Sequence, residues 1–345
     1  MPLPPRWVRR LVLAPAMVAI AVVLLASLPV WLLLAAAASP LVPGRMRALR
    51  VIWLGAVYLA LEAAALVALF ALWLVSGFGW RVRQPGFQRA HYVLTAWYLR
   101  VLFWQGCWVL RLRIIVEGTD PDAVGPGRPL LVFCRHAGPG DSFILTHSLV
   151  NTYEREPRIV LKDTLQWAPA IDVMLNRLPS RFLTAGEGST DQVGELARHL
   201  DHNDAFVIFP EGGNFTPRRR TRAIERLHSL GLHRLAERAA AMRHVLAPRP
   251  GGVLAALDAA PEADVVWVAH TGLDRMLTIG DVWRELPMDK AIRMRWFAVP
   301  AGEVPDGREE RVEWLYDWWH RIDAWIDEHR RDRVHRAERG PRGHG

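Results

Sequence analysis

The feature that most constrains this 345-residue chain is an apolar run near its N-terminus. Residues 11–38 form a stretch of about 28 residues without a charge, whereas about 20 apolar residues suffice to cross a bilayer. A cleaved signal peptide is the competing interpretation, because Arg6, Arg9 and Arg10 precede the run. The run is roughly twice as long as a normal signal core, however, so the sequence predicts a retained membrane segment.

A second apolar run, residues 51–75, carries only Glu62. An ionisable residue at membrane depth costs a few kcal/mol unless it faces a partner or water, so we expect this run to be inserted and Glu62 to have a partner. Arginines flank both runs on every side, and charge therefore does not fix the topology. A re-entrant or half-inserted hairpin would keep all flanks on the cytoplasmic side, and we prefer it to two full crossings. Residues 92–110 are rich in Trp and Leu but include Arg100 and Gln105, which predicts an interfacial helix.

Composition limits what the rest of the chain can be. The 51% of hydrophobic residues exclude a disordered chain, and the 23% of charged residues exclude a bundle made only of lipid-facing helices. The net charge of +8 comes almost entirely from arginine, and codon bias is its simplest explanation. No nucleic-acid-binding motif occurs, so we expect no nucleic-acid partner, and the positive charge favours an anionic membrane surface or a phosphorylated substrate. Two cysteines provide neither a disulfide framework nor a Cys-rich zinc site.

The part after residue 110 predicts a layered α/β domain with a central mixed sheet. Strand-like runs alternate there with helical patterns. A helix over residues 312–326 places Trp and Ile on one face, and packing on the domain is favoured over docking at lipid head groups. The predicted organisation is therefore a membrane helical hairpin with an interfacial helix (1–110), an α/β catalytic domain (111–300), and an amphipathic helix with an Arg-rich tail (301–345). The predicted strands are 112–116, 129–133, 158–161, 205–209, 265–268 and 294–299.

The first motif with chemical content pairs a histidine with an aspartate. An apolar strand runs into a tight turn that begins at His136 and ends at Asp141, and an amphipathic helix follows. Asp141 would hold the imidazole in one tautomer, which leaves the other nitrogen to deprotonate a hydroxyl group. The spacing alone is weak evidence, because His199 and Asp204 repeat it in a polar turn that we interpret as a solvated loop. The strand before the turn and the helix after it distinguish the first pair.

The second motif is Phe209-Pro210-Glu211-Gly212-Gly213-Asn214, which follows another apolar strand. A proline, a carboxylate and paired glycines make a sharp turn whose backbone N–H groups are able to face an anion or oxyanion. The alternative is an ordinary glycine turn with an exposed glutamate. The motif by itself does not separate the two.

Together the two motifs resemble the glycerophospholipid acyltransferase family, whose members carry a His-x4-Asp block and then a Phe-Pro-Glu-Gly block on an α/β domain behind membrane helices. The resemblance covers roughly residues 110–299. Lys162 begins a segment similar to the family's Lys-x-x-Leu-x-x-x-Pro, and Arg181 stands near the family's substrate-binding arginine, with Arg177 as the neighbouring alternative. Phe215-Thr216 and the Leu-Ala-Pro-Arg at 246–249 resemble the subgroup of lysophosphatidic and lysocardiolipin acyltransferases.

The resemblance implies transfer of a fatty acyl group from acyl-CoA or acyl carrier protein to the free hydroxyl of a lysophospholipid in the bilayer. The expected acceptor is 1-acyl-sn-glycerol-3-phosphate, which gives phosphatidate for phospholipid biosynthesis. It implies no metal and no cofactor, and it implies an integral protein of the cytoplasmic membrane with its catalytic domain on the cytoplasmic side. The implied site comprises a catalytic pair, His136 and Asp141, and substrate-binding residues Glu211, Gly212, Gly213, Arg181 and Lys162.

One departure from the family pattern concerns the acceptor. Many lysophosphatidate-specific members have Thr-Arg after Glu-Gly, where this chain has Gly213-Asn214. A lysophosphodiester acceptor of the lysocardiolipin, lysophosphatidylglycerol or lysophosphatidylinositol type, used in acyl-chain remodelling, carries less charge and is the alternative. Another alternative is that Arg218, Arg219 and Arg220 supply the positive charge that is missing at Asn214. Two further classes remain open at this point: a catalytically silent membrane scaffold, and a lipid hydrolase in which water replaces the lysolipid.

Overall fold

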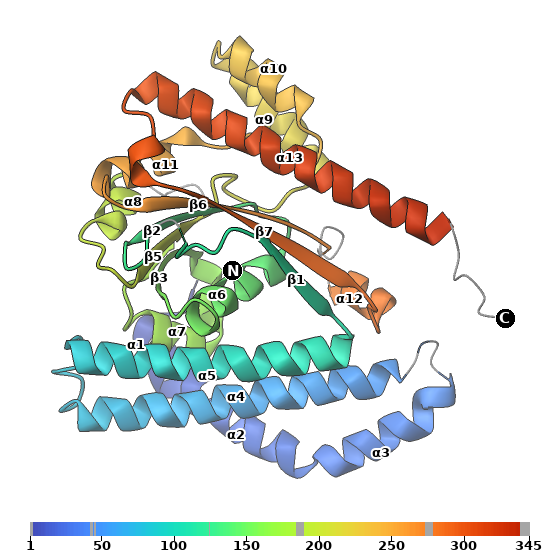
Figure 1. Ribbon diagram of the computed structural model, residues 1–345. Coiled ribbons are helices and arrows are strands. Elements are labelled where there is room, and N and C mark those ends of the chain that lie inside the picture. The colour runs from blue at the N-terminus through green and yellow to red at the C-terminus, as the bar shows by residue number, and fades with distance from the viewer. Residues whose placement is uncertain are drawn as a thin grey trace. The chain divides into compact units, whose positions relative to one another are not determined.

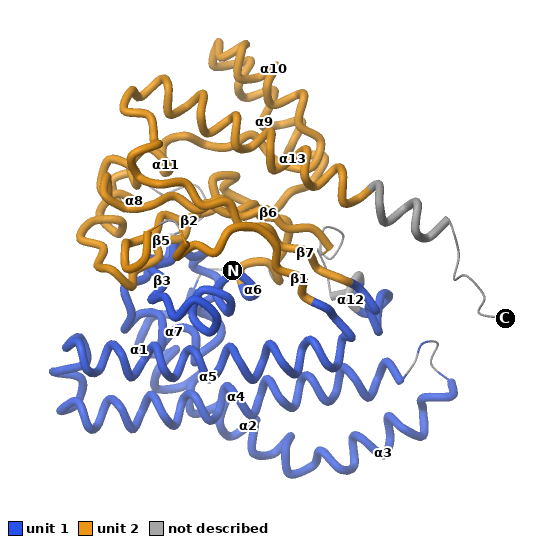
Figure 2. The backbone as a smooth tube through the Cα atoms, viewed as in Figure 1, with its two compact units in different colours: residues 1–113, 143–189, 278–290 blue, residues 114–142, 190–277, 291–345 orange. Residues whose placement is uncertain are grey.

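The computed structural model describes residues 3–41, 44, 46–123, 125–183, 190–272 and 279–338 (Figure 1). The chain divides into two compact units, shown in different colours in Figure 2. Unit 1 comprises residues 1–113, 143–189 and 278–290, and unit 2 comprises residues 114–142, 190–277 and 291–345.

Unit 1 is mainly helical. Three of its helical segments are long and apolar enough, by length and composition, to cross a membrane: Arg6–Ala26, Arg47–Val75 and Pro85–Leu110. These helices suggest membrane association, and the interfacial placement of 92–110 stays a prediction. The elements of the unit are α1 (Arg6–Val8), η1 (Arg9–Leu13), α2 (Ala14–Ala26), α3 (Leu28–Ala38), η2 (Ser39–Leu41), α4 (Arg47–Val75), α5 (Pro85–Leu110), β3 (Glu156–Lys162), η3 (Asp163–Trp167), α7 (Pro169–Leu175), β4 (Arg181–Leu183) and α12 (Ile279–Glu285); α6 (Pro139–Asn151) begins in unit 2.

The first apolar run is not one continuous helix. It breaks at Ser27, where the backbone has φ −87° and ψ −1°, and α3 restarts the helix with Pro29 in its first turn. Proline has no N–H to donate and its ring collides with the preceding turn, so the helix ends before it. The Ser27 hydroxyl group donates to the Val23 and Leu24 carbonyls at 2.9 and 3.2 Å, which satisfies part of the broken end.

Glu62 and Arg9, two ionisable residues of unit 1 that lie in apolar surroundings, have partners. Glu62 is fully buried and accepts hydrogen bonds from the Tyr98 hydroxyl (3.0 Å) and the Ala170 amide (3.1 Å). Arg9 donates to both carboxylate oxygens of the buried Asp172, at 3.2 and 3.0 Å. A buried carboxylate without a partner would be costly. The two hydrogen bonds of Glu62 confirm the expectation that it faces a partner.

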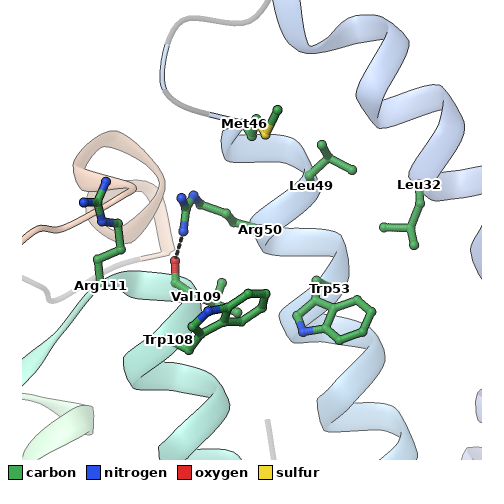
Figure 3. Close-up of a pocket in the computed structure, with 8 residues that line it drawn as sticks. All are labelled: Leu32, Met46, Leu49, Arg50, Trp53, Trp108, Val109 and Arg111. Carbon is green, nitrogen blue, oxygen red and sulfur yellow. Dashed lines mark hydrogen bonds between the residues drawn. The ribbon is translucent and has the colours of Figure 1, made fainter.

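A cavity of about 520 Å³ lies in unit 1, where the ends of α3, α4 and α5 come together (Figure 3). Its walls are apolar and aromatic except for two arginines, and the Arg50 guanidinium group donates to the Val109 carbonyl. None of the candidate site residues from the sequence lines it. The lining residues are Leu32, Met46, Leu49, Arg50, Trp53, Trp108, Val109 and Arg111.

Unit 2 is built on a mixed sheet with strand order β1-β7-β6-β2-β5. Strand β2 pairs in parallel with both β5 and β6, and β7 pairs antiparallel with β6. All residues of β2 and β6 are buried, as expected for strands covered on both faces. The predicted α/β class with a central mixed sheet is confirmed. The strands are β1 (Arg113–Gly118), β2 (Leu130–Cys134), β5 (Asp204–Ile208), β6 (Asp264–Thr271) and β7 (Ala291–Val299).

Helices cover this sheet, and α13 packs against β6. The Trp318 ring stacks on Trp267 with centroids 5.6 Å apart, and Trp319 and Ile322 are fully buried. The C-terminal helix therefore packs on the domain, and docking of its Trp face at lipid head groups is wrong for these residues. The helices are α8 (Thr190–Ala197), α9 (Pro217–Ser229), α10 (His233–Ala241), α11 (Pro250–Ala259), η4 (Ala301–Glu303) and α13 (Arg308–Glu338).

The register of β2 and β5 positions both motifs. Phe133 is the partner of Ile208, so the two parallel strands end side by side (Figure 1). The carboxyl ends of parallel strands lie at one edge of the sheet, which is where open α/β sheets bind their ligands. The turns that follow β2 and β5 therefore begin next to each other.

Candidate active site

His136 lies in the turn between β2 and α6. Its Nδ1 atom is 3.1 Å from Oδ2 and 3.2 Å from Oδ1 of Asp141, which sits in the first turn of α6. The imidazole is partly accessible, with 20% of the side chain exposed, whereas the carboxylate is buried. Asp141 thus holds the imidazole through Nδ1, and the ring remains partly accessible to solvent.

The turn satisfies the Asp141 carboxylate almost completely. Oδ2 accepts the amides of Ala137 (2.6 Å) and Gly138 (2.9 Å), and Oδ1 accepts the amide (2.6 Å) and the hydroxyl (3.2 Å) of Ser142. Burial by itself raises the pKa of Asp141, but the hydrogen bond with His136, the charges of His270 and His136 and the Gly138 amide together lower it below its usual range. An ionised carboxylate only accepts, so Nδ1 of His136 carries the hydrogen and Nε2 of the neutral ring is the basic atom.

Glu211 is buried and joins the second motif to the first. Its Oε1 atom accepts the His136 amide at 3.1 Å, and Oε2 accepts the Leu246 amide at 2.9 Å. Burial raises the pKa of Glu211 to about 7, although the charge of Arg135 and the two amides act in the opposite direction. An ordinary glycine turn with an exposed glutamate is therefore the wrong interpretation, because Glu211 is 2% exposed.

The turn after Glu211 closes around His136. The Phe215 amide donates to the His136 carbonyl at 2.9 Å, so this histidine is held through both its amide and its carbonyl group. Gly212 has φ +66°, a left-handed conformation that glycine adopts without strain. A Cβ atom at Gly212 would lie 3.0 Å from Cζ of Arg249, and one at Gly213 would lie 3.0 Å from Nη1 of Arg219.

Two buried residues beside the site escaped the sequence reasoning. Arg135 is fully buried and donates to the carbonyls of His270 and His244, both at 2.8 Å. The Nε2 atom of His270 is 3.0 Å from the Arg135 carbonyl and 3.5 Å from Oδ2 of Asp141. The available signal was an ionisable side chain next to an apolar stretch in each case, Arg135 directly after β2 and His270 near the end of β6, which is costly to bury without partners.

Lys162 and Arg181 form a separate pair within unit 1. Lys162 ends β3 and Arg181 begins β4, and the parallel register aligns Arg181 with Val160. Since side chains alternate along a strand, Lys162 and Val160 point to the same face, so both cations lie on one face of the strand pair. Arg177, the alternative to Arg181, instead donates from its guanidinium group to the Leu69 carbonyl at 2.8 Å.

The second His-x4-Asp match is not a solvated loop throughout. Asp204 is the first residue of β5 and is 2% exposed, and its carboxylate accepts the Asp201 amide at 2.8 Å. His199 is exposed. The structure therefore brings His136, Asp141, Glu211, Gly212 and Gly213 together in unit 2, and no group of His, Cys, Asp or Glu suited to a metal ion occurs among the residues it describes.

These features define a domain that holds the Nδ1 atom of a histidine against an ionised aspartate at the carboxyl edge of a mixed sheet. Residues 113–260 match the model of the family described as Acyltransferase. No curated protein sequence matches the chain.

A solved structure with some similarity is the crystal structure of the 1-acyl-sn-glycerophosphate (LPA) acyltransferase PlsC from Thermotoga maritima. The TM-score is 0.45 and the sequence identity is 13%, over 78% of this chain and 98% of that chain.

Proposed function

We propose that the protein is a membrane-bound lysophospholipid acyltransferase. It transfers a fatty acyl group from an acyl-CoA or acyl carrier protein thioester to the free hydroxyl of 1-acyl-sn-glycerol-3-phosphate and yields phosphatidate. The observation that carries the proposal is the His136–Asp141 pair, joined through Glu211 to the second motif inside the segment that matches the Acyltransferase family model. The long apolar helices of unit 1 support a lipid substrate and an integral position in the cytoplasmic membrane.

The geometry suits general-base catalysis. Nε2 of His136 takes the proton of the acceptor hydroxyl as its oxygen attacks the thioester carbonyl. The tetrahedral intermediate collapses, the C–S bond breaks, and the departing thiolate takes the proton back from the imidazolium. Asp141 remains ionised throughout, holds the ring in one tautomer and stabilises its positive charge. The balance requires no covalent intermediate on the protein and no metal.

The resemblance to the glycerophospholipid acyltransferase family suggests the substrate-binding roles. Glu211, Gly212 and Gly213 shape the acceptor site beside His136, and the exposed Lys162 and Arg181 supply positive charge for phosphate. One observation favours a second acceptor class, a lysophosphodiester such as lysophosphatidylglycerol or lysocardiolipin: Gly213-Asn214 places no cationic side chain directly after the Glu-Gly pair. A phosphodiester needs less compensation because it carries less charge.

An acceptor panel tests the proposal. Detergent-solubilised protein receives labelled oleoyl-CoA together with lysophosphatidate, with lysophosphodiester lipids, or with no lysolipid. We expect label in phosphatidate. Label confined to a phosphodiester product would favour the second acceptor class, and free fatty acid released without any lysolipid would indicate a hydrolase. No transfer or release under any condition would support a catalytically silent scaffold and would contradict the proposal.

A further inference from the structure

The paired glycines of the second motif lie against two arginines from other parts of unit 2. Cζ, Nε and Nη1 of Arg249 lie 3.0, 3.1 and 3.1 Å from the position of a Cβ atom on Gly212. These nearly equal distances mean that the guanidinium plane lies flat over the glycine. A Cβ atom at position 212 would require the guanidinium group to shift by a few tenths of an ångström, and the positive φ of Gly212 independently favours glycine there.

Arg219 occupies the corresponding place at Gly213. Its Nη1 atom is 3.0 Å from a Cβ position on Gly213 and donates to the Asn214 carbonyl at 3.1 Å. Arg220, its neighbour, has a different role, because it donates to the Met242 and Ala240 carbonyls at the end of α10. Of the three arginines that the sequence suggested as compensation, Arg219 is thus the one that contacts the turn.

Neither guanidinium group is neutralised by a carboxylate. Within the part of unit 2 that the structure describes, no ion pair reaches Arg219 or Arg249, and both side chains are exposed. The nearest acidic motif residue, Glu211, is buried with both oxygens engaged by amides. Arg219 also lies in the first turn of α9, where the helix dipole disfavours a cation. Two like charges in this position are electrostatically unfavourable unless an anion joins them.

The position of Arg249 relative to His136 is fixed by short connections. The Arg249 amide donates to the Pro210 carbonyl at 2.8 Å, and the Leu246 amide three residues earlier donates to Glu211. The other oxygen of that glutamate accepts the His136 amide. A single buried carboxylate therefore links the segment that carries Arg249 to the residue that carries the base.

We propose that Arg249, with Arg219 beside it, binds the phosphomonoester head group of the acceptor lipid. The pair replaces, from other segments of the chain, the arginine that is absent at Asn214. A planar guanidinium group binds phosphate through two parallel hydrogen bonds, and two such groups match the double charge of a phosphomonoester better than the single charge of a phosphodiester. The inference rests on the proposed function and specifies its acceptor.

Steady-state kinetics of Arg249→Ala with two acceptors tests the assignment. We expect the KM for lysophosphatidate to rise at least about tenfold while kcat changes less than about threefold, since the lost contact binds substrate without taking part in proton transfer. The KM for lysophosphatidylglycerol should rise less than that for lysophosphatidate. Arg249→Lys should lie between wild type and Arg249→Ala, because lysine keeps the charge but not the paired hydrogen bonds. Arg226→Ala is the matched control for the loss of one positive charge. Arg226 is exposed and lies about two turns after Arg219 in α9.

Direct binding keeps the test independent of turnover. Labelled lysophosphatidate is titrated into detergent-solubilised protein in the wild-type form and with Arg249→Ala or Arg226→Ala, and the thermal unfolding midpoint of each is recorded. The site is supported if Arg249→Ala binds lysophosphatidate more weakly than wild type and Arg226→Ala do, with an unchanged thermal unfolding midpoint. Equal affinity of wild type and Arg249→Ala for lysophosphatidate, or an equal rise of the KM for both acceptors, would overturn it. Absence of transfer by wild type would contradict only the proposed function, because binding still decides the role of Arg249.

Discussion

The turns that follow β2 and β5 each place one carboxylate beside His136, but they put these groups in opposite electrostatic states. The turn after β2 surrounds Asp141 with three amides, a hydroxyl and the imidazole, and the pKa of Asp141 is lowered. The turn after β5 gives Glu211 only two amides, and burial raises its pKa to about 7. The difference shows that burial alone does not determine ionisation, because the number of donors aimed at the buried group decides it.

The comparison assigns different work to the two carboxylates. Asp141 is a permanent anion and acts on the ring of His136. Glu211 accepts two backbone amides and positions them. Replacing Asp141 by its neutral isostere should therefore lower kcat, whereas replacing Glu211 by its neutral isostere should lower the stability of the fold.

The largest effect is expected for Asp141→Asn. An amide side chain donates as well as accepts, so it no longer fixes Nδ1–H of His136 or stabilises the imidazolium. We expect kcat to fall by about 10²–10⁴, the range associated with general acid–base groups. Steady-state transfer assays measure this, with circular dichroism as the control for folding. A loss of less than tenfold in a folded variant would show that the two turns do not differ in the way described.

Glu211→Gln should change stability and its dependence on pH. The folded-state pKa is raised from its ordinary value near 4.5 to about 7, so the stabilising contribution of Glu211 is complete below pH 4.5 and is lost as the pH rises through 7. Glutamine has one accepting oxygen, which leaves one of two buried amides unpaired at a cost of about 1–3 kcal/mol. Thermal unfolding between pH 5 and 8 should show a lower midpoint for the variant and a shallower pH slope. A parallel pH slope in both proteins would refute the assignment.

Arg181→Ala extends the comparison to the cation pair of unit 1. If Arg181 binds acceptor phosphate, its loss should raise the acceptor KM by about threefold to tenfold and leave kcat nearly unchanged. Varying the lysophosphatidate concentration at saturating oleoyl-CoA gives both constants. A fall in kcat alone would contradict a binding role.

The smallest effect is expected for Ser142→Ala. This change removes the hydroxyl contact of 3.2 Å to Asp141 but keeps the Ser142 amide contact of 2.6 Å. A hydrogen bond to a charged group contributes about 1.5–3 kcal/mol, but this contact is long and three amides still hold the carboxylate, so we expect less than about a fivefold reduction in kcat. A reduction as large as that of Asp141→Asn would mean that the hydroxyl group, and not the backbone amides, maintains the ionised carboxylate.

The sequence predicted the elements that have a clear hydropathy pattern, either a continuous apolar run or a helical period. The apolar strand before His136 and the one before Glu211 are present as β2 and β5, and the C-terminal Trp pattern is present as α13. Short elements carry too few residues to show a period, and β4, which contains Arg181, was not predicted for that reason. Hydropathy also hid the break at Ser27, because the residues on both sides of it are equally apolar.

For the site, local motifs were informative and long-range partners were not. The motif containing His136 predicted its neighbour Asp141, since both lie in one turn. Contacts between distant segments, such as Leu246 with Glu211 or Arg249 with Gly212, depend on how the sheet edge brings loops together. Nothing in the spacing of these residues along the chain indicates those contacts.

The most direct test of the central claim is the acyl-transfer rate of His136→Ala beside wild type, with labelled oleoyl-CoA and lysophosphatidate in the same detergent. The account predicts that wild type forms labelled phosphatidate and that the variant loses at least about a hundredfold in kcat while it keeps its thermal unfolding midpoint. Turnover by the folded variant within tenfold of wild type would contradict the assignment of His136 as the general base.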